Sequence, residues 1–183
     1  MTTNVPPART FVIRDARSDE RDVMAELTKR SYAEYATIMD PKSWRGLSAA
    51  IHAALKSSEA TRIVAEDHGT VIGSVMLYPP RANAYGEEVR RVGWPEVRLV
   101  AVDPAARGRG VAQALMDECV RRARASGATN LGIHTSRSMR AAMRLYARMG
   151  FVRAPEHDFQ PPGAEVVEGY RLRLEAFGGE DSR

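Results

Sequence analysis

Six residues between a short apolar segment and a long amphipathic one have the composition of an anion-binding loop. From Arg107 to Ala112 they are Arg-Gly-Arg-Gly-Val-Ala. Gly108 and Gly110 have no Cβ atom to block a phosphate, and the two arginines add positive charge. A helix that begins at Gly110 would also aim free N–H groups and its dipole at an anion. The alternative is a glycine-rich turn that only connects two elements, because a short glycine motif is weak evidence.

Two common nucleotide-binding motifs do not fit this loop. A Rossmann fingerprint requires a third small residue where Gln113 stands, and an acid after the next strand, where the chain has His134-Thr135-Ser136. A P-loop requires a lysine and a hydroxyl residue after its last glycine, and Val111 and Ala112 occupy those positions. The loop therefore favours neither a dinucleotide nor a nucleoside triphosphate.

The segments on either side of the loop predict the elements that position it. Residues 97–102 are apolar except for Arg98, which is typical of a strand buried on both faces. Residues 110–125 have apolar side chains at helical spacing, and Cys119 within that stripe is expected to be core rather than reactive. A strand over 130–134 then completes a β-helix-β unit, which implies a parallel strand pair.

The remainder of the chain predicts a mixed α/β fold. Ser18 is expected to cap a helix that runs to about residue 36, and a second helix is expected to restart at Pro41. Periodicity and turn residues predict strands over 11–14, 61–66, 70–78, 151–154 and 168–175, a loop over 81–95 and a helix over 139–148. This order predicts a mixed sheet with helices on its faces.

Length and composition favour one soluble domain. The 183 residues are 44% hydrophobic and 27% charged, and no apolar run approaches the roughly 18 residues of a membrane span. Residues 1–9 lack the apolar core of a secretory signal, so we expect a cytoplasmic protein. We expect a single domain over residues 10–176, a flexible N-terminal segment over 1–9 and a flexible C-terminal tail over 177–183.

Charge and cysteine content exclude other classes. The formal net charge is +4, but the basic residues are almost all arginine and form no dense block, so we expect no nucleic-acid partner. Cys119 is the only cysteine and the four histidines are scattered. These counts predict neither an intramolecular disulfide nor a metal site.

Two motifs in register resemble the GNAT superfamily of N-acetyltransferases. The family's coenzyme A motif is Q/R-x-x-G-x-G/A after a strand that ends in a V-D-P-like turn. Val102-Asp103-Pro104 is followed here by the fixed positions of that motif, Arg107, Gly110 and Ala112. Downstream, an A-x-x-L-Y-x-x-x-G-F pattern is matched by Ala142, Leu145, Tyr146, Gly150 and Phe151. The resemblance is specific over residues 96–151 and extends in element order over 10–174.

The resemblance implies a mostly antiparallel sheet with one splayed parallel strand pair and helices on both faces. Pantetheine would enter the gap and pair with backbone groups of residues 99–102 as an added strand, and one N–H would polarise the thioester carbonyl. The acetyl group of acetyl-CoA would pass directly to a bound amine, so no acyl intermediate on Cys119 is implied. The expected coenzyme-binding residues are Val100, Ala101, Val102, Arg107, Gly108, Arg109, Gly110, Val111, Ala112 and Ser136.

Direct transfer requires a base for the amine and an acid for the leaving thiolate. In the family, a tyrosine at the position of Tyr146 points at the coenzyme sulfur; packing against the sheet is the alternative. Glu96 begins the central strand, where many members carry the acid that deprotonates the amine, and a solvated strand-start carboxylate is the alternative. His134 is a second candidate base at the end of the next strand, or a structural histidine.

The chain departs from the family pattern at one position. Many members have an asparagine that binds pantetheine where this chain has Met139, so Ser136 or backbone groups would have to replace it. On the acceptor side, Tyr32, Tyr35 and Trp44 lie on the first helices, which in similar proteins wall the substrate pocket. An aromatic core is the alternative for these three side chains.

The sequence thus predicts an acetyl-CoA-dependent N-acetyltransferase that acts on an amine of a small molecule or a peptide in a ternary complex. The expected partners are acetyl-CoA as co-substrate and the amine acceptor, with no metal and no membrane. A homodimer is compatible with the prediction. The alternative function is a catalytically silent coenzyme A binding sensor or scaffold.

Overall fold

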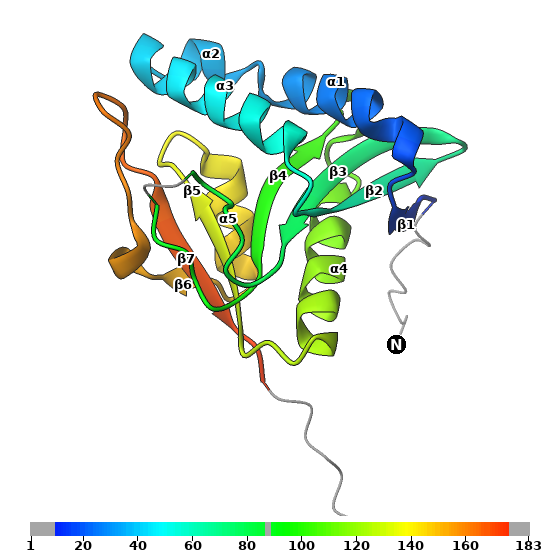
Figure 1. Ribbon diagram of the computed structural model, residues 1–183. Coiled ribbons are helices and arrows are strands. Elements are labelled where there is room, and N and C mark those ends of the chain that lie inside the picture. The colour runs from blue at the N-terminus through cyan, green and yellow to red at the C-terminus, as the bar shows by residue number, and fades with distance from the viewer. Residues whose placement is uncertain (1–9, 87–88, 176–183) are drawn as a thin grey trace, which may run out of the picture.

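Seven strands form one mixed sheet in the order β1-β2-β3-β4-β5-β7-β6 (Figure 1). The structure is a computed structural model that describes residues 10–86 and 89–175, so the predicted terminal segments lie outside the described residues. The strands are β1 (Val12–Asp15), β2 (Thr61–Asp67), β3 (Thr70–Tyr78), β4 (Glu96–Val102), β5 (Asn130–Thr135), β6 (Val152–Arg153) and β7 (Glu168–Arg173).

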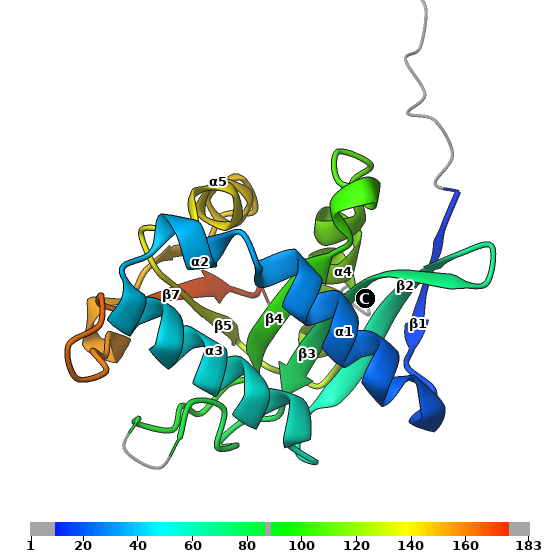
Figure 2. The ribbon, with the colours of Figure 1, turned by 90° about the horizontal axis from the view of Figure 1, so that it is seen from above.

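Helices cover both faces of the sheet (Figure 1, Figure 2). One face carries α1 (Arg21–Tyr32), α2 (Tyr35–Ile38) and α3 (Pro41–Lys56), and the other carries α4 (Val111–Ala125) and α5 (Arg140–Arg148). Three 3₁₀ turns are η1 (Ser18–Glu20), η2 (Pro104–Ala106) and η3 (Pro155–His157). Within the part of the chain that the structure describes, no helix is long and apolar enough to cross a membrane.

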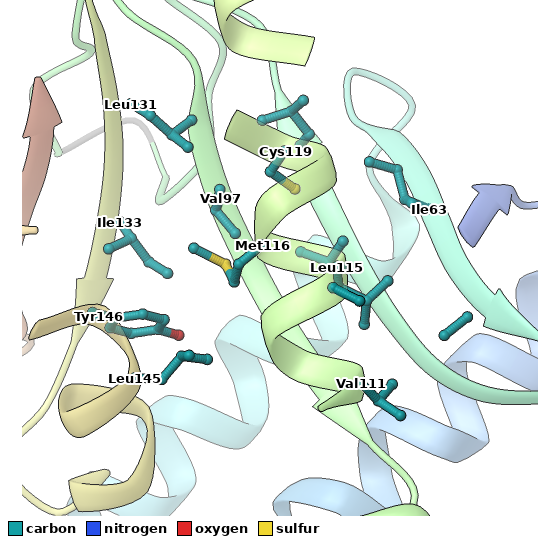
Figure 3. Close-up of a cluster of buried hydrophobic side chains, with 14 of the residues drawn as sticks. Ile63, Val97, Val111, Leu115, Met116, Cys119, Leu131, Ile133, Leu145 and Tyr146 are labelled. Atoms are coloured by element: carbon teal, nitrogen blue, oxygen red, sulfur yellow. The ribbon is translucent and has the colours of Figure 1, made fainter. Parts of the chain in front are cut away.

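Alternation along the strands builds a core on each face. On β2, Ile63 and Ala65 belong to the cluster under α4, while Val64 between them packs with Met24 of α1. Such alternation follows from the two-residue period of a strand. Figure 3 shows the α4 side of the core, where the helix stripe that includes Cys119 faces side chains of the sheet. Cys119 is 0% exposed, which confirms its expected place in the core.

The parallel pair is short and then opens. β4 and β5 are paired at Glu96↔Gly132 and Val97↔Ile133 alone among the described residues. Next to this point, the register between β3 and β4 shifts by a bulge, and Leu99 has a φ of 53°, in the left-handed region that side chains rarely adopt. The other pairs are antiparallel. The predicted fold class, a mostly antiparallel sheet with a splayed parallel pair, is confirmed.

The first helical segment differs from the prediction. Ser18 does not cap the helix; it lies inside η1, and α1 ends at Tyr32, before the separate short helix α2. At this turn the backbone N–H of Arg17 donates to the Glu20 carboxylate at 2.6 Å. The acid three residues after Arg17 therefore accepts from the N-cap N–H, as the acid of a capping box does, and no side chain caps this turn from the N-cap position.

An arginine joins this turn to the sheet. Arg14 of β1 donates through Nη2 to Glu20 at 2.6 Å and through Nε to Glu66 of β2 at 2.8 Å. Glu20 is 5% exposed. The Arg14 side chain, followed by the Arg17 N–H group, lowers the pKa of Glu20 from its ordinary value of 4.5 to about 2.

This shift predicts acid sensitivity. Because the folded-state pKa lies below 4.5, the charged Glu20 stabilises the fold above that pH, and the contribution is lost as the pH falls toward 2. Glu20→Gln is expected to unfold at lower urea concentration near neutral pH and to show a shallower loss of stability over this acid range. Urea unfolding at a series of pH values measures both. Glu26→Gln, at an exposed pair with Lys29, is the control with a small effect. Parallel acid profiles for wild type and Glu20→Gln would contradict the assignment.

Candidate functional site

Two cavities meet where β4 and β5 part. The first, the loop cavity, has a volume of about 580 Å³ and is lined by β4, the first turn of α4 and α5. The second, the α3 cavity, has a volume of about 560 Å³ and lies between α3, β3 and the loops 79–95 and 155–167. Six residues line both cavities: Tyr32, Arg98, Leu99, His134, Thr135 and Met139.

The loop cavity has the features of an anion site. Gly108 and Gly110 have φ values of 77° and 78°, and a Cβ at either position would meet no atom within 4 Å. The first bond of α4 runs from the N–H of Ala114 to the carbonyl of Gly110. The preceding N–H groups therefore have no acceptor in the helix and are available to a ligand. Residues 110–113 all line the cavity, as does Gly108, so the open backbone is where the sequence predicts it.

The two arginines of the loop are held by carboxylates. Arg107 lines the loop cavity and donates to Glu34 at 2.9 Å and to the carbonyl of Ser31 at 3.2 Å. Arg109 does not line it, because its guanidinium bonds to Asp67 at 2.5 Å and to Thr10 at 2.8 Å. Arg148, at the end of α5, lines the cavity and was not among the expected residues. Arg148 lies on the helix of the second motif, but it is not one of the motif's fixed positions, so the motif spacing does not identify it.

Backbone groups of β4 face the opening. The hydroxyl of Tyr32 donates to the carbonyl of Val100 at 3.3 Å, and the N–H of Val102 donates to Ser31 Oγ at 3.2 Å. Val100 and Val102 line the loop cavity, whereas the Ala101 side chain is buried and lines neither cavity. Two of the backbone groups expected to bind pantetheine are therefore bonded to side chains of α1.

Tyr146 lies in the wall of the loop cavity. Figure 3 shows its ring beside Ile133 of β5, with the hydroxyl pointing toward β4. Tyr146 is 5% exposed and its ring centroid is 5.8 Å from that of Phe151, so packing accounts for one edge of the ring. Burial, followed by the nearby Tyr32 and Tyr35 hydroxyls, raises the pKa of Tyr146 well above 10. A phenol in this environment keeps its proton and can donate a hydrogen bond.

Glu96 and His134 form a buried pair. Glu96 Oε1 lies 3.3 Å from His134 Nδ1, and neither atom has another partner among the described residues. His134 Nε2 lies 2.9 Å from the carbonyl of His157, which can only accept, so Nε2 carries a proton. The lone pair of Nδ1 then faces a carboxylate oxygen, and a proton between them would satisfy both atoms. Glu96 is 5% exposed and lines neither cavity, so it is not a solvated strand-start residue.

The other predicted site residues are divided between the cavities. Tyr35 lines the loop cavity, and Ser136 lines the α3 cavity. Trp44 of α3 lines neither cavity. Loops contribute Tyr85, Phe159 and Glu165 to the α3 cavity, and the sequence pattern identified none of these three residues individually. The absence of a regular period in those loops left no signal for the individual residues.

A family model described as the acetyltransferase (GNAT) family matches residues 22–151. The chain belongs to the GNAT acetyltransferase family. A curated relative, the mycothiol acetyltransferase of Amycolatopsis mediterranei (strain U-32), is 35% identical over 92 residues, which are 49% of this chain and 29% of that protein. The chain thus spans less than a third of this relative's length.

Solved structures share the GNAT fold. A GNAT family acetyltransferase of Staphylococcus aureus Mu50 has a TM-score of 0.63 and 16% identity, with 90% of this chain and 99% of that chain covered. The ribosomal-protein-S18-alanine N-acetyltransferase of Escherichia coli has a TM-score of 0.61 and 16% identity, with 94% and 99% covered. A GNAT acetyltransferase of Brucella melitensis, solved in complex with acetyl-CoA, has a TM-score of 0.53 and 23% identity, with 87% and 96% covered. The predicted family resemblance is confirmed.

Gly73 of β3 sets how closely α4 approaches the sheet. A Cβ at this position would lie 2.6 Å from Val111 Cγ1 and 3.2 Å from the backbone oxygen of Ala101. Since Val111 belongs to the first turn of α4, the missing side chain lets that turn, and the glycine loop before it, lie directly on the strands.

We predict that Gly73→Ala lowers the free energy of unfolding by about 1–3 kcal/mol, because an added methyl overpacks this contact. Gly46→Ala is the matched control, since a Cβ on this helical residue meets nothing within 4 Å and alanine favours a helix. Chemical denaturation of both variants measures the difference. An unchanged midpoint for Gly73→Ala would show that α4 can shift without cost.

Proposed function

We propose that this GNAT family member transfers the acetyl group of acetyl-CoA to an amine held in the α3 cavity. The observation that carries the proposal is the meeting of the loop cavity, with the free N–H groups of its glycine loop, and a largely apolar second cavity at the gap between β4 and β5. Membership of an acetyltransferase family and the acetyl-CoA complex of the Brucella melitensis protein support the choice of donor.

In this proposal the coenzyme occupies the loop cavity. The pyrophosphate lies on the free N–H groups of residues 108–112, at the positive end of the α4 dipole. The pantetheine arm lies along β4 and forms hydrogen bonds with the backbone of Val100 and Val102. These bonds replace the ones that Tyr32 and Ser31 make to the same two backbone groups. Ser136 is on the other side of the gap, in the α3 cavity wall, and its buried Oγ has no partner among the described residues.

The chemical step is a direct attack. The amine nitrogen bonds to the thioester carbonyl carbon, the C–S bond breaks, and Tyr146 donates its proton to the departing sulfur. The amine proton passes to the Glu96–His134 pair through water, because His134 lines both cavities while Glu96 lies behind it. Backbone N–H groups of the opened β4 stabilise the oxyanion.

The test of the proposed function is release of coenzyme A. Acetyl-CoA is incubated with a broad panel of amines, and free thiol and acetylated product are measured by absorbance and mass spectrometry. Acetylated amine with equimolar thiol supports the proposal. Tight binding of acetyl-CoA with no thiol release across the panel would leave a coenzyme A binding sensor or scaffold in its place.

A first prediction of the proposed function concerns the glycine loop, residues 107–112. Gly110→Asp places a negative charge at the N-terminus of α4, where the charge of the pyrophosphate would lie, and is expected to weaken acetyl-CoA binding by about tenfold or more. Calorimetry measures the affinity. Gly127→Asp is the matched control, since its φ is 76° and a Cβ would also meet nothing within 4 Å, at the opposite end of the same helix. Equal affinities for the two variants would contradict the loop assignment.

A second prediction of the proposed function concerns Tyr146, the proposed proton donor. Tyr146→Phe keeps the ring and removes the donor, so kcat is expected to fall on the order of 10²-fold while the affinity for acetyl-CoA changes little. Tyr170→Phe is the control, because its hydroxyl bonds to Glu168 and the residue lines neither cavity. Steady-state kinetics and calorimetry separate the two effects. Full turnover by Tyr146→Phe would reduce the residue to a packing role.

A further inference from the structure

We propose that the acceptor is a small primary amine with a single charged end and a hydrocarbon or aromatic body, and that Glu165 binds the charged end. This inference rests on the proposed function and names its substrate class. It depends on how polar and apolar side chains are distributed around the α3 cavity.

One side of the α3 cavity is apolar. Small and aliphatic residues of α3 face buried aromatic and aliphatic residues of β3, β4 and the loop 155–167. These residues are Leu47, Ala50, Ala54, Tyr78, Leu99 and Phe159. Tyr78 is 1% exposed and its hydroxyl already donates to the carbonyl of Ala54 at 3.5 Å. This side therefore offers burial of apolar surface and few free polar groups to a ligand.

The opposite side carries polar atoms without partners. Thr135 Oγ1, Ser136 Oγ and Glu165 Oε1 are buried in the α3 cavity wall and make no hydrogen bond with the described residues. Buried polar atoms normally have a partner, and a buried carboxylate oxygen requires a donor. Thr135 ends β5 and Ser136 follows it, and Glu165 of the loop 155–167 is joined to the same β5–α5 connection through Ser138. An ammonium group supplies the donors that these three oxygens lack.

Glu165 is held in place for this role. Its Oε2 accepts from Ser138 at 3.1 Å, and its backbone N–H donates to Ser43 Oγ at 2.8 Å. Ser43 in turn bonds to Asp40, the residue that caps α3. One carboxylate oxygen is thus used to fix the loop to the β5–α5 connection, and the other is buried with no hydrogen-bond partner among the described residues.

Charge in the wall disfavours amino acids and polyamines. Arg98 is the one arginine or lysine among the described lining residues, and it is occupied, since it donates to the carbonyl of Ala84 and lies 4.4 Å from the Tyr85 ring centroid. A substrate carboxylate would find no free cation. The acidic residues of the described wall are Glu165 and Glu59, and Glu59 already accepts from the N–H of Asn83 at 3.3 Å. A second ammonium would have only Glu59, an exposed side chain, as its acidic partner in the described wall.

The bond between the Glu165 N–H and Ser43 Oγ also connects two walls of the α3 cavity. It joins the loop 155–167 to the first turn of α3, across residues distant in the sequence. A volume of about 560 Å³ suits a small molecule. A peptide chain would have to break this bond to leave the cavity at that side.

A panel of matched probes tests the inference. The acceptors are 2-phenylethylamine, phenylalanine, which adds a carboxylate, spermidine, which adds charges, and a glycine-rich tetrapeptide. We expect kcat/KM for 2-phenylethylamine to exceed that for each of the others by about tenfold or more. A higher value for phenylalanine, spermidine or the peptide overturns the inference, while thiol release with that acceptor leaves the proposed function intact.

Binding without turnover gives an independent measurement. Calorimetry with 2-phenylethylamine and with 2-phenylethanol, which lacks the charge, is expected to show tighter binding of the amine. No heat from either compound, with another amine acetylated, would exclude this acceptor class. Acetylation of no amine at all would contradict the proposed function and the inference together.

Glu165→Gln tests the residue. The glutamine oxygen can still accept from Ser138, so the loop keeps its anchor while the charge is removed. KM for 2-phenylethylamine is expected to rise about tenfold, with kcat and the affinity for 2-phenylethanol little changed. Glu156→Gln, which lies in η3 outside both cavities, is the control. Equal KM values for Glu165→Gln and wild type would assign the charged end of the acceptor elsewhere.

Discussion

The structure depends on the early separation of β4 from β5. A parallel pair of this kind has a continuous ladder when both strands stay flat, and here the ladder stops after two pairs because a bulge turns β4 at Leu99. Leu99 has a positive φ and yet is 7% exposed, so burial of its side chain offsets an uncommon backbone conformation. Without that turn β5 would satisfy the edge of β4, and neither cavity would reach the other.

The separation leaves backbone groups that the protein must satisfy. Buried N–H and C=O groups are costly when unpaired, and here Tyr32 and Ser31 of α1 take the positions that a neighbouring strand would have filled. These contacts are long, at 3.3 and 3.2 Å, and come from side chains that can rotate. α1 is thereby a hydrogen-bond partner for β4 and a wall of the loop cavity at once.

The fold could be predicted from the sequence where the local residue pattern and the tertiary contacts favour the same structure. The strands on each side of the glycine loop, the helix 111–125 and the loop itself follow from apolar spacing and from glycines that later prove to have positive φ. The predicted cap at Ser18 was wrong because Arg14, six residues before Glu20 and on β1, bonds to that acid, and the turn begins at Arg17. The N-cap propensity of Ser18 could not indicate that Arg14 of β1 would bond to Glu20.

The site could be predicted in part, where its residues follow from local sequence pattern. The role proposed for residues 108–112 requires only their backbone, whose direction follows from the strand-loop-helix order. The relation between Glu96 and His134 depends on register, because they lie on neighbouring strands and meet only where the short parallel pair aligns them. Tyr85, Phe159 and Glu165 come from segments without regular period, so no spacing marks them. The role of each predicted site residue stays a prediction, whereas its position is now known.

The buried Cys119 thiol can report on the opening of α4. Cys119 is the only cysteine, it lies in the middle of α4, and burial raises the pKa of its thiol to about 12. A thiol reagent needs both access and thiolate, so in the folded state it meets neither. Labelling of Cys119 then proceeds only when α4 lifts from the sheet, and its rate measures how often the helix behind the glycine loop opens. A ligand that binds the closed form slows that labelling in proportion to its affinity, so coenzyme binding becomes measurable without any turnover.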